Sequence, residues 1–185
     1  MLVEVRWHGR GGQGIVTVSR LLAQAALLDG KYVQAFPEFG PERRGAPVTG
    51  YTRISDEPIS IHCHIYNPNI VVIVDPTLID KIDVLKGLVE DGTIVANTEK
   101  APRELKESLN VEKARVYTVN ATRIALDVLG RPIYNTAMLG ALVKASPLVT
   151  LESISKVVTE RFPGAVGEKN VAVIKRAYEE AEGIE

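Results

Sequence analysis

Apolar residues along the first part of the chain change their spacing twice. Leu2–Trp7 alternates as a strand does, whereas Gln13–Leu28 carries apolar residues at a 3.6-residue period, which predicts an amphipathic helix. Gly30 is a typical helix stop, and Lys31–Phe36 then has the pattern of a second strand. This strand–helix–strand order predicts a crossover unit and hence a parallel sheet.

The next segment breaks the regular pattern. Phe36–Val48 contains three prolines and two glycines, which predicts a long loop. Val48–Ser55 and Pro58–Ile65 then flank Asp56 and Glu57 at the spacing of a β-hairpin. We therefore expect two antiparallel strands inserted into an otherwise parallel sheet.

Alternation of strands and helices resumes after this insertion. Asn69–Val74 is a nearly continuous apolar run, typical of a strand buried on both faces, and the pattern after it predicts a helix through Leu88. Further strands are expected at Gly92–Thr98 and Ala114–Val119, around a short helix at Pro102–Leu109. The remaining expected helices are Ala121–Leu129, Thr136–Ser146, Leu151–Phe162 and Glu168–Ala181. The order predicts one α/β domain over residues 1–185, a three-layer Rossmann-like sheet with an inserted β-hairpin and a helical C-terminal end.

Composition and charge narrow the functional class. The 185 residues are 45% hydrophobic and 24% charged, enough for one sizeable core. A formal net charge of −1 gives no basic excess for nucleic acid. No apolar run approaches the roughly 20 residues of a membrane span, and Glu4 and Arg6 interrupt any signal-peptide core. We expect a cytoplasmic protein with neither nucleic acid nor membrane as partner.

A glycine-rich stretch joins the first predicted strand to the first predicted helix. Its residues Gly9, Gly11 and Gly14 satisfy the pattern G-x-G-x-x-G in the strand-to-helix context that gives this motif its meaning. Such glycines allow close approach of an anion to the N–H groups of a helix N-terminus. A phosphate or pyrophosphate is therefore the expected ligand, and the alternative is a tight turn without a ligand. The candidate residues are Gly9, Arg10, Gly11, Gly12, Gln13 and Gly14.

The residues beyond the second predicted strand bear on which phosphate compound binds. An NAD site would have an acidic residue at the end of this strand, but the nearest acid, Glu38, lies beyond Pro37. Two cations, Arg43 and Arg44, follow, which favours a ligand with an additional phosphate, such as NADP or coenzyme A. Alternatively, the arginines are solvated or pair with neighbouring glutamates.

Two histidines and one cysteine stand next to each other in the chain, and both residue types bind metals. On a strand, His62 and His64 would face one side and Cys63 the other, so the three ligands would not converge and we expect no metal site. His8, beside the glycine loop, has two possible roles, a hydrogen bond to a ligand phosphate or a structural one, and the structural role is the more common.

Polar residues precede three of the predicted helices. Asp75 ends the buried strand at the sheet edge where α/β proteins bind ligands, but it is equally placed to cap the next helix. Asn120 and Asn135 each precede a predicted helix, where capping is the ordinary use of asparagine.

Taken together, five stretches of the chain resemble one enzyme family. They resemble the gamma subunit of archaeal and bacterial 2-oxoacid:ferredoxin oxidoreductases, most of all the pyruvate and branched-chain 2-oxoacid enzymes. The likeness runs from about Val3 to Tyr178, and its second stretch is the most specific. The stretches are HGRGGQG, YVQAFPEFGPERRGAPV, NPNIVVIVDPTLID, VNATRIAL and NTAMLGALV.

The resemblance implies a multisubunit enzyme that decarboxylates a 2-oxoacid on thiamine diphosphate, reduces ferredoxin through iron–sulfur clusters and delivers the acyl group to coenzyme A. In such a family, thiamine diphosphate, its Mg²⁺ and the clusters belong to the alpha, beta and ferredoxin-like delta subunits. The single cysteine here, Cys63, cannot hold a cluster, which takes about four thiolates. We therefore expect no catalytic residue, no metal ligand and no cofactor bound by this chain alone.

The residues and the resemblance converge on coenzyme A as the ligand of this chain. Its pyrophosphate suits a glycine-rich loop, and its 3′-phosphate suits Arg43 and Arg44. The alternative function is a freestanding NADP-binding oxidoreductase or dinucleotide-binding module. A chain of 185 residues with no recognisable substrate domain leaves little room for that chemistry.

Overall fold

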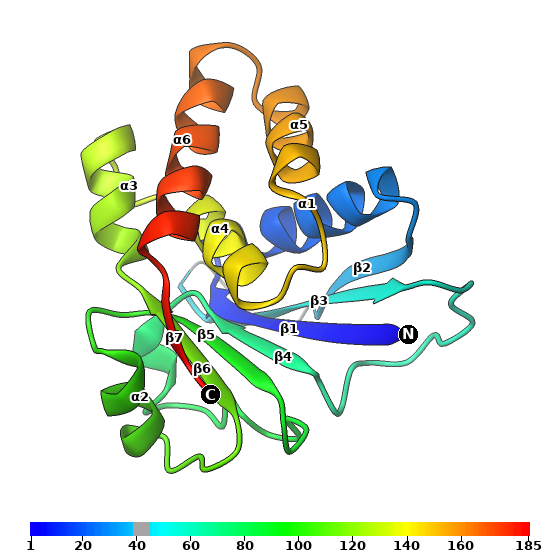
Figure 1. Ribbon diagram of the computed structural model, residues 1–185, viewed down its shortest axis with the longest axis vertical. Coiled ribbons are helices and arrows are strands. Elements are labelled where there is room, and N and C mark those ends of the chain that lie inside the picture. Colours follow the sequence, from blue (N-terminus) through cyan, green and yellow to red (C-terminus); the bar gives the residue numbers. More distant parts are fainter. Residues whose placement is uncertain (39–44) are drawn as a thin grey trace.

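The computed structural model describes residues 1–38 and 45–185, which form a mixed α/β fold around one seven-stranded sheet with the strand order β2-β3-β1-β4-β5-β6-β7 (Figure 1). The strands are β1 (Leu2–Arg10), β2 (Tyr32–Glu38), β3 (Pro47–Ser55), β4 (Ile70–Ile73), β5 (Thr93–Asn97), β6 (Arg115–Val119) and β7 (Glu182–Ile184). The helices are α1 (Ile15–Leu28), α2 (Pro102–Ser108), α3 (Ala121–Leu129), α4 (Asn135–Ala145), α5 (Leu151–Arg161) and α6 (Ala165–Glu180), with a 3₁₀ helix, η1, at Pro76–Leu78. The expected fold class is confirmed.

The centre of the sheet is parallel and its edges are antiparallel. Strand β1 pairs in parallel with β4, β4 with β5, and β5 with β6, whereas β7 joins β6 antiparallel. Strand β3 pairs antiparallel with both β1 and β2. Strands β1 and β2 therefore run in the same direction, as the predicted crossover requires, but β3 lies between them.

The antiparallel hairpin of the fold is formed by β2 and β3. The prediction that Val48–Ser55 pairs with a second strand at Pro58–Ile65 was wrong, because the latter segment has no strand conformation. It is held instead by side chains: Gln34 Nε2 donates to the carbonyl of Ile61 at 2.9 Å, and Arg53 Nη2 donates to that of His64 at 3.3 Å. Strand β3 already has a partner on each side, so Pro58–Ile65 finds no free edge beside it.

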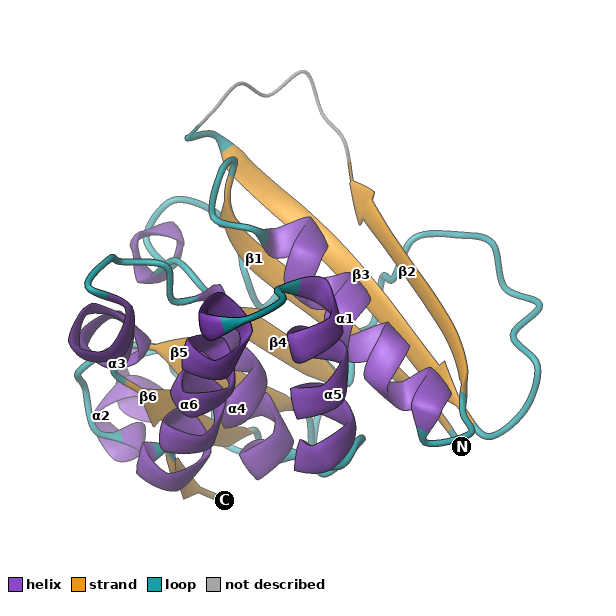
Figure 2. Cartoon of the chain, turned by 90° about the horizontal axis from the view of Figure 1, so that it is seen from above, coloured by secondary structure: helices purple, strands orange, loops and turns teal. Residues whose placement is uncertain are grey.

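One face of the sheet carries the larger helical layer. Helices α1, α4, α5 and α6 lie on this face (Figure 2) and enclose the main core. Helix α4 is buried along nearly its whole length. Trp7, Leu142 and Ile174 are fully buried there and join strand, inner helix and outer helix. This layer positions the first turns of α1 and α4 next to each other.

The opposite face has a thinner cover. Helix η1, the turns up to Leu88 and helix α2 pack over Val71, Ile73 and Ile94. The expected α-helix through Leu88 was wrong, because only the three-residue η1 forms. Asp83 accepts a hydrogen bond from the backbone N–H of Leu85, a local pairing that competes with helix formation.

Candidate functional site

The glycine-rich loop leads from the carboxyl end of β1 into the first turn of α1. Gly12 and Gly14 have φ values of 96° and 75°, in the left-handed region that favours glycine. Gly14 is the N-cap of α1, and no described side chain caps this helix. A Cβ at Gly9 would overlap the side chain of Ile15, so this glycine permits the close packing of β1 against α1. The loop thus presents an uncapped helix N-terminus at the carboxyl edge of the sheet.

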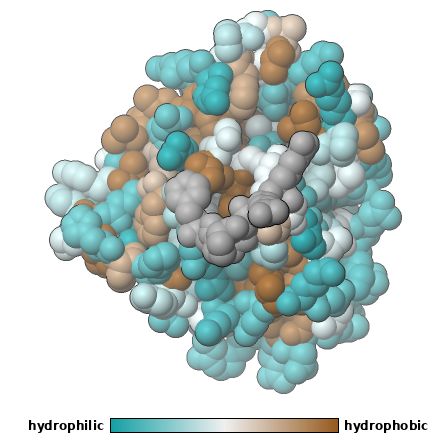
Figure 3. All heavy atoms as spheres, turned by 180° about the vertical axis from the view of Figure 1, so that it is seen from behind, coloured by the Kyte–Doolittle hydropathy of each residue, from teal (hydrophilic) through white to brown (hydrophobic). Residues whose placement is uncertain are grey.

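The loop is fixed to the residues that precede β3. The backbone N–H of Gly11 donates to the carbonyl of Ala46 at 2.8 Å, and that of Gly45 donates to the carbonyl of Gly11 at 3.1 Å. The glycine loop and the described end of the proline-rich segment therefore meet at one edge of the sheet. Arg43 and Arg44 lie outside the described residues. Figure 3 shows the molecule from behind, and apolar and polar side chains are mixed on this face.

The side chains of Gln13 and Arg10 are held by a network centred on Asp75. Gln13 Nε2 donates to Asp75 Oδ2 at 2.7 Å and to the Tyr134 hydroxyl at 2.9 Å, while Gln13 Oε1 accepts from the backbone N–H of Arg10. Arg10 Nε forms an ion pair with Asp75 Oδ2 at 3.1 Å, and its Nη2 donates to Thr77 Oγ1. These two side chains, expected as phosphate donors, hold the shape of the loop in this structure.

Asp75 has the capping role, one of the two alternatives that the sequence left open for this residue. Its side chain caps η1 by accepting from the backbone N–H of Thr77 at 3.0 Å. Burial alone would raise the pKa of this carboxyl, but hydrogen bonds from Thr77 and Gln13 outweigh burial and lower the pKa below its ordinary value. Asp75 therefore remains ionised at neutral pH and is a fixed counter-charge for Arg10.

Helix α4 contributes two residues that the sequence did not connect with the loop. Asn135, only 7% exposed, lies with its Nδ2 3.5 Å from the carbonyl of Gly14, and Tyr134 contacts Gln13. The predicted cap at Asn120 is confirmed, because its side chain accepts from the backbone N–H of Arg123. Asn135 is instead the first helical residue after the N-cap Tyr134. Only the fold, which packs α4 beside α1, reveals this contact.

His8 is a buried structural residue. It is 5% exposed, and its Nε2 accepts from Arg6 Nε at 3.0 Å. Burial, together with the positive charge of Arg6, lowers the pKa of His8 to about 4, so the ring is neutral at pH 7. No described residue bonds its Nδ1.

His62, Cys63 and His64 lie in the segment that crosses the face of β2 and β3. The ring of His64 packs edge-on against Tyr51 at 5.7 Å, and Cys63 is exposed. Among the described residues, no group of three His, Cys, Asp or Glu side chains has the arrangement of a metal site.

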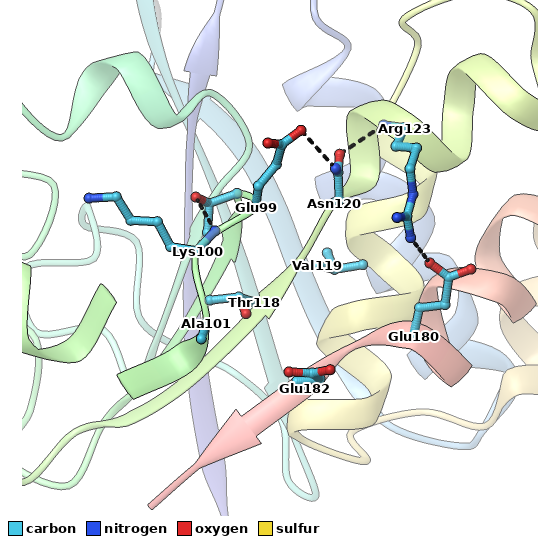
Figure 4. A pocket seen from close by; sticks show the side chains of 10 residues that line it. Glu99, Lys100, Ala101, Thr118, Val119, Asn120, Arg123, Glu180 and Glu182 are labelled. Atoms are coloured by element: carbon cyan, nitrogen blue, oxygen red, sulfur yellow. Dashed lines mark hydrogen bonds and ion pairs between the residues drawn. The ribbon is translucent and has the colours of Figure 1, made fainter. Parts of the chain in front are cut away.

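A polar cavity lies at the other end of the same sheet edge. This β5–β6 pocket, about 470 Å³ in volume, is bordered by the ends of β5 and β6 and by the start of β7 (Figure 4). Its charged side chains mostly have partners within the chain. Arg123 Nη2 pairs with Glu180 Oε2 at 2.7 Å, and Asn120 Nδ2 donates to Glu99 Oε1 at 3.0 Å. The pocket is lined by Thr98, Glu99, Lys100, Ala101, Thr118, Val119, Asn120, Arg123, Glu180 and Glu182.

Comparison with known proteins assigns the family. The family model described as pyruvate ferredoxin/flavodoxin oxidoreductase matches residues 4–180. The chain belongs to this family. It is 52% identical to the pyruvate/ketoisovalerate oxidoreductases common subunit gamma of Pyrococcus furiosus, over 100% of both chains. It is 50% identical to pyruvate synthase subunit PorC of Methanothermobacter marburgensis, over 96% of this chain and 97% of that protein.

Two solved structures agree with the fold. The pyruvate oxidoreductase subunit PORC of Thermotoga maritima matches with a TM-score of 0.89 at 42% identity, over 100% of this chain and 99% of that chain. The 2-oxoglutarate:ferredoxin oxidoreductase of Magnetococcus marinus, solved with 2-oxoglutarate, coenzyme A and succinyl-CoA bound, matches with a TM-score of 0.73 at 19% identity. That match covers 96% of this chain and 30% of the other, and it shows a shared fold.

The family comparison makes this chain a subunit of an oxidoreductase, of the gamma type. Within the described residues, no helix is long and apolar enough to cross a bilayer. The names of the relatives thus confirm the resemblance seen in the sequence.

Proposed function

We propose that this chain is the gamma subunit of a cytoplasmic 2-oxoacid:ferredoxin oxidoreductase that converts pyruvate or a related 2-oxoacid to acyl-CoA. Its role in the complex is to bind coenzyme A and to join the other subunits. The observation that carries this proposal is the uncapped N-terminus of α1, presented by Gly12 and Gly14 at the carboxyl edge of the sheet. Support for the reaction comes from the named relatives.

The loop has the chemistry that a pyrophosphate requires. The first turn of an α-helix has N–H groups without intrahelical partners and a partial positive charge, which together favour a phosphate oxygen. Asp75 and Tyr134 hold Gln13 and so fix the loop before the ligand arrives, which lowers the ordering cost of binding. Arg43 and Arg44, from the adjoining segment, are the proposed partners of a further phosphate.

The remaining chemistry is assigned to partner subunits. Thiamine diphosphate with Mg²⁺ would supply the decarboxylation, and iron–sulfur clusters would carry electrons to ferredoxin, on the alpha, beta and delta chains. The one cysteine of this chain, Cys63, leaves no cluster ligand set here. We expect the purified chain to show no turnover with a 2-oxoacid and any electron acceptor, and measurable turnover would contradict the proposal.

The sheet order argues against a freestanding NADP-binding module. In the dinucleotide fold, β2 lies directly beside β1, and the residue at its end reaches the adenosine ribose. Here β3 lies between them, so the end of β2 is about 9.6 Å from β1, two strand spacings away. The glycine loop can therefore bind a phosphate, but the end of β2, which binds the ribose in the dinucleotide fold, does not lie next to it.

Substitution of Gly12 tests the loop in the assembled complex. In Gly12→Val, a β-branched residue replaces a glycine at φ 96°, which strains the backbone and places methyl groups at the phosphate site. We expect the KM for coenzyme A to rise at least about tenfold while the 2-oxoacid KM is unchanged. Gly14 is not used for this test, because a Cβ there would overlap the Asn135 amide.

Gly30→Val is the matched control. Gly30 has a similar φ of 78°, with no described atom within 4 Å of an added Cβ, and lies after the other end of α1. Both variants thus have the same kind of backbone strain, and only Gly12→Val has it at the proposed site. An equal coenzyme A KM in the two variants would contradict the assignment of the loop.

A further inference from the structure

The helical layer contains a second cavity, at the ends of four of its helices. This α4–α6 pocket, about 530 Å³ in volume, is bordered by the first turns of α1, α4 and α6 and by the end of α5, all on one face of the sheet (Figure 2). Its lining includes Arg131, Ile133, Arg161, Phe162, Val166 and Lys169. Cations and large apolar side chains are thus combined in one surface depression.

Three cations line this pocket without counter-ions. Arg131 lies between α3 and α4, Arg161 at the end of α5 and Lys169 in α6. Among the described residues, none of the three forms an ion pair, and Arg161 only stacks over the Phe162 ring at 5.2 Å. No described lining residue is acidic. The positive charge of the pocket is therefore not balanced within this part of the chain, which favours an anionic partner.

The helix ends at the pocket add to this positive charge. Helices α1, α4 and α6 all begin beside it, and none of the three has a hydrogen bond from its N-cap side chain to its first turn. The first N–H groups of a helix lack intrahelical partners and carry a partial positive charge. The helix ends and the three cations are independent features, and both favour negatively charged groups at this position.

The pocket also exposes apolar surface. Ile133 and Val166 are 48% and 58% exposed, and covering them would remove apolar surface from water. The buried lining residues Thr136 and Asn170 are satisfied within the chain, because Thr136 Oγ1 donates to Asn170 Oδ1 at 2.8 Å and Asn170 Nδ2 donates to the carbonyl of Val166. A partner that fits this surface therefore combines anionic groups with apolar side chains.

A peptide segment meets these requirements better than a small anion does. A small anion would pair with one or two of the cations, but it would leave Ile133 and Val166 in water. A segment in which Asp or Glu residues are interspersed with apolar residues would contact both kinds of side chain. The chain is a subunit of an oxidoreductase, so other chains of a complex are available as the source of this segment.

We propose that the α4–α6 pocket is the docking site for an acidic segment of a partner subunit. This inference rests on the proposed function, since it assigns one surface by which the chain joins the complex. Carboxylates of the segment pair with Arg131 and Lys169, and its apolar side chains cover Ile133 and Val166. The glycine loop and the α4–α6 pocket thus have separate roles, in ligand binding and in assembly.

Exchange of the labelled full-length chain into the intact complex tests the proposal, because it gives the Kd of this chain for its partner subunits. In Arg131→Ala/Lys169→Ala, we expect this Kd to rise about tenfold or more and to depend less on salt than in wild type, since fewer ion pairs are screened. Both side chains are exposed, so folding should be preserved. Lys100→Ala/Arg103→Ala is the matched control, with the same loss of one exposed lysine and one exposed arginine. It should keep the wild-type Kd.

Cross-linking of the intact complex with a carbodiimide identifies the occupant of the pocket. The reagent activates a carboxylate, which then forms an amide bond with a lysine amine in contact with it. We expect Lys169 to be joined to an Asp or Glu of another subunit, and Lys100 not to be. Cross-links of Lys169 only within its own chain, or a wild-type Kd in the pocket variant, would overturn the proposal.

The KM for coenzyme A separates this inference from the proposed function. The pocket variant that does assemble should keep the wild-type KM, whereas Gly12→Val should raise the KM and keep the wild-type Kd. A pocket variant that assembles normally and has a higher KM would overturn the inference, because the pocket would then hold a small anionic ligand. If Gly12→Val leaves the KM unchanged while the pocket variant loses assembly, the loop assignment fails and the docking site stands.

Discussion

The α4–α6 pocket and the β5–β6 pocket are similar in size and opposite in electrostatic character. Their volumes are about 530 and 470 Å³. In the β5–β6 pocket, Arg123 is paired with Glu180, and Glu99 accepts from Asn120. In the α4–α6 pocket, no acidic residue among the described lining balances the cations. Volume alone would not separate the two, whereas the presence or absence of counter-ions does.

The comparison also separates two uses of arginine in this chain. Arg10 and Arg123 have carboxylate partners and stabilise local structure. Arg131 and Arg161 have none among the described residues, although both line one pocket. Cations that line a pocket without an acidic partner favour a bound anion.

The largest effect is expected from Arg43 and Arg44, which the sequence predicts as phosphate ligands. In the complex, Arg43→Ala/Arg44→Ala should weaken coenzyme A binding about 10- to 150-fold, the loss of a charge-assisted bond of about 1.5–3 kcal/mol. The effect should be steepest at low salt, where screening is weakest. Decarboxylation should survive. If the double variant instead lost subunit assembly while the remaining complex kept its normal affinity for coenzyme A, the two arginines would be interface residues.

A smaller effect should follow from exchanging charge between the two pockets. Lys169→Glu places a carboxylate in the α4–α6 pocket and should raise the Kd of this chain for its partner subunits about tenfold, an increase that salt reduces. The reverse change, Glu182→Lys in the β5–β6 pocket, should leave this Kd unchanged. A similar increase in both variants would mean that the long-range field of the complex, and not the pocket, controls the Kd.

Stability should distinguish the paired from the unpaired arginine. Arg123→Met removes an exposed ion pair with Glu180 and should lower the free energy of unfolding by less than about 1 kcal/mol. For a chain of this size, that corresponds to a decrease in Tm of at most about 2–4 °C. Arg131→Met removes no described ion pair and should leave the Tm unchanged or slightly higher. Thermal unfolding of the purified chain measures both Tm changes. A larger decrease in Tm for Arg131→Met than for Arg123→Met would contradict the comparison.

The smallest effect concerns the pH dependence of the Arg123 pair. Hydrogen bonds from Arg176 first, and then from Arg123, lower the pKa of Glu180 from 4.5 despite its partial burial. A lowered folded-state pKa gives stability that is present above the unfolded pKa and is lost as pH falls through the folded pKa. The stability difference between wild type and Arg123→Met should therefore shrink below about pH 4.5. A difference that grows in acid would contradict this assignment.

The sequence predicted most of the helices and strands because their apolar periodicity is strong. It predicted the strand–helix context of Gly9–Gly14 and the cap at Asn120, which depend on neighbouring residues alone. It failed at Pro58–Ile65, whose alternating pattern fits a strand but whose strand edge is already occupied by β1 and β2. It also missed β7, because three residues are too few to show a period.

The sequence predicted the centre of the candidate site but not its surroundings. Asp75 and Gln13 are separated by 62 positions and Tyr134 and Gln13 by 121, so only the packing of η1 and α4 against the loop joins them. The α4–α6 pocket likewise draws on α1, α4, α5 and α6, and no local motif unites Thr17 with Lys169. Such sites depend on tertiary contacts that a single sequence does not display.

Hydrogen–deuterium exchange of the intact complex with and without coenzyme A tests the proposed binding site directly. Assembly alone, compared with the free chain, should slow exchange at residues 129–136 and 161–170, which form the α4–α6 pocket. On addition of coenzyme A, we predict slower exchange in this chain at residues 9–17, which form the glycine loop and the first turn of α1. We predict no change on this addition at residues 98–101 and 118–123 of the β5–β6 pocket. Protection by coenzyme A confined to the β5–β6 pocket, or no protection anywhere in this chain, would contradict the assignment of the loop.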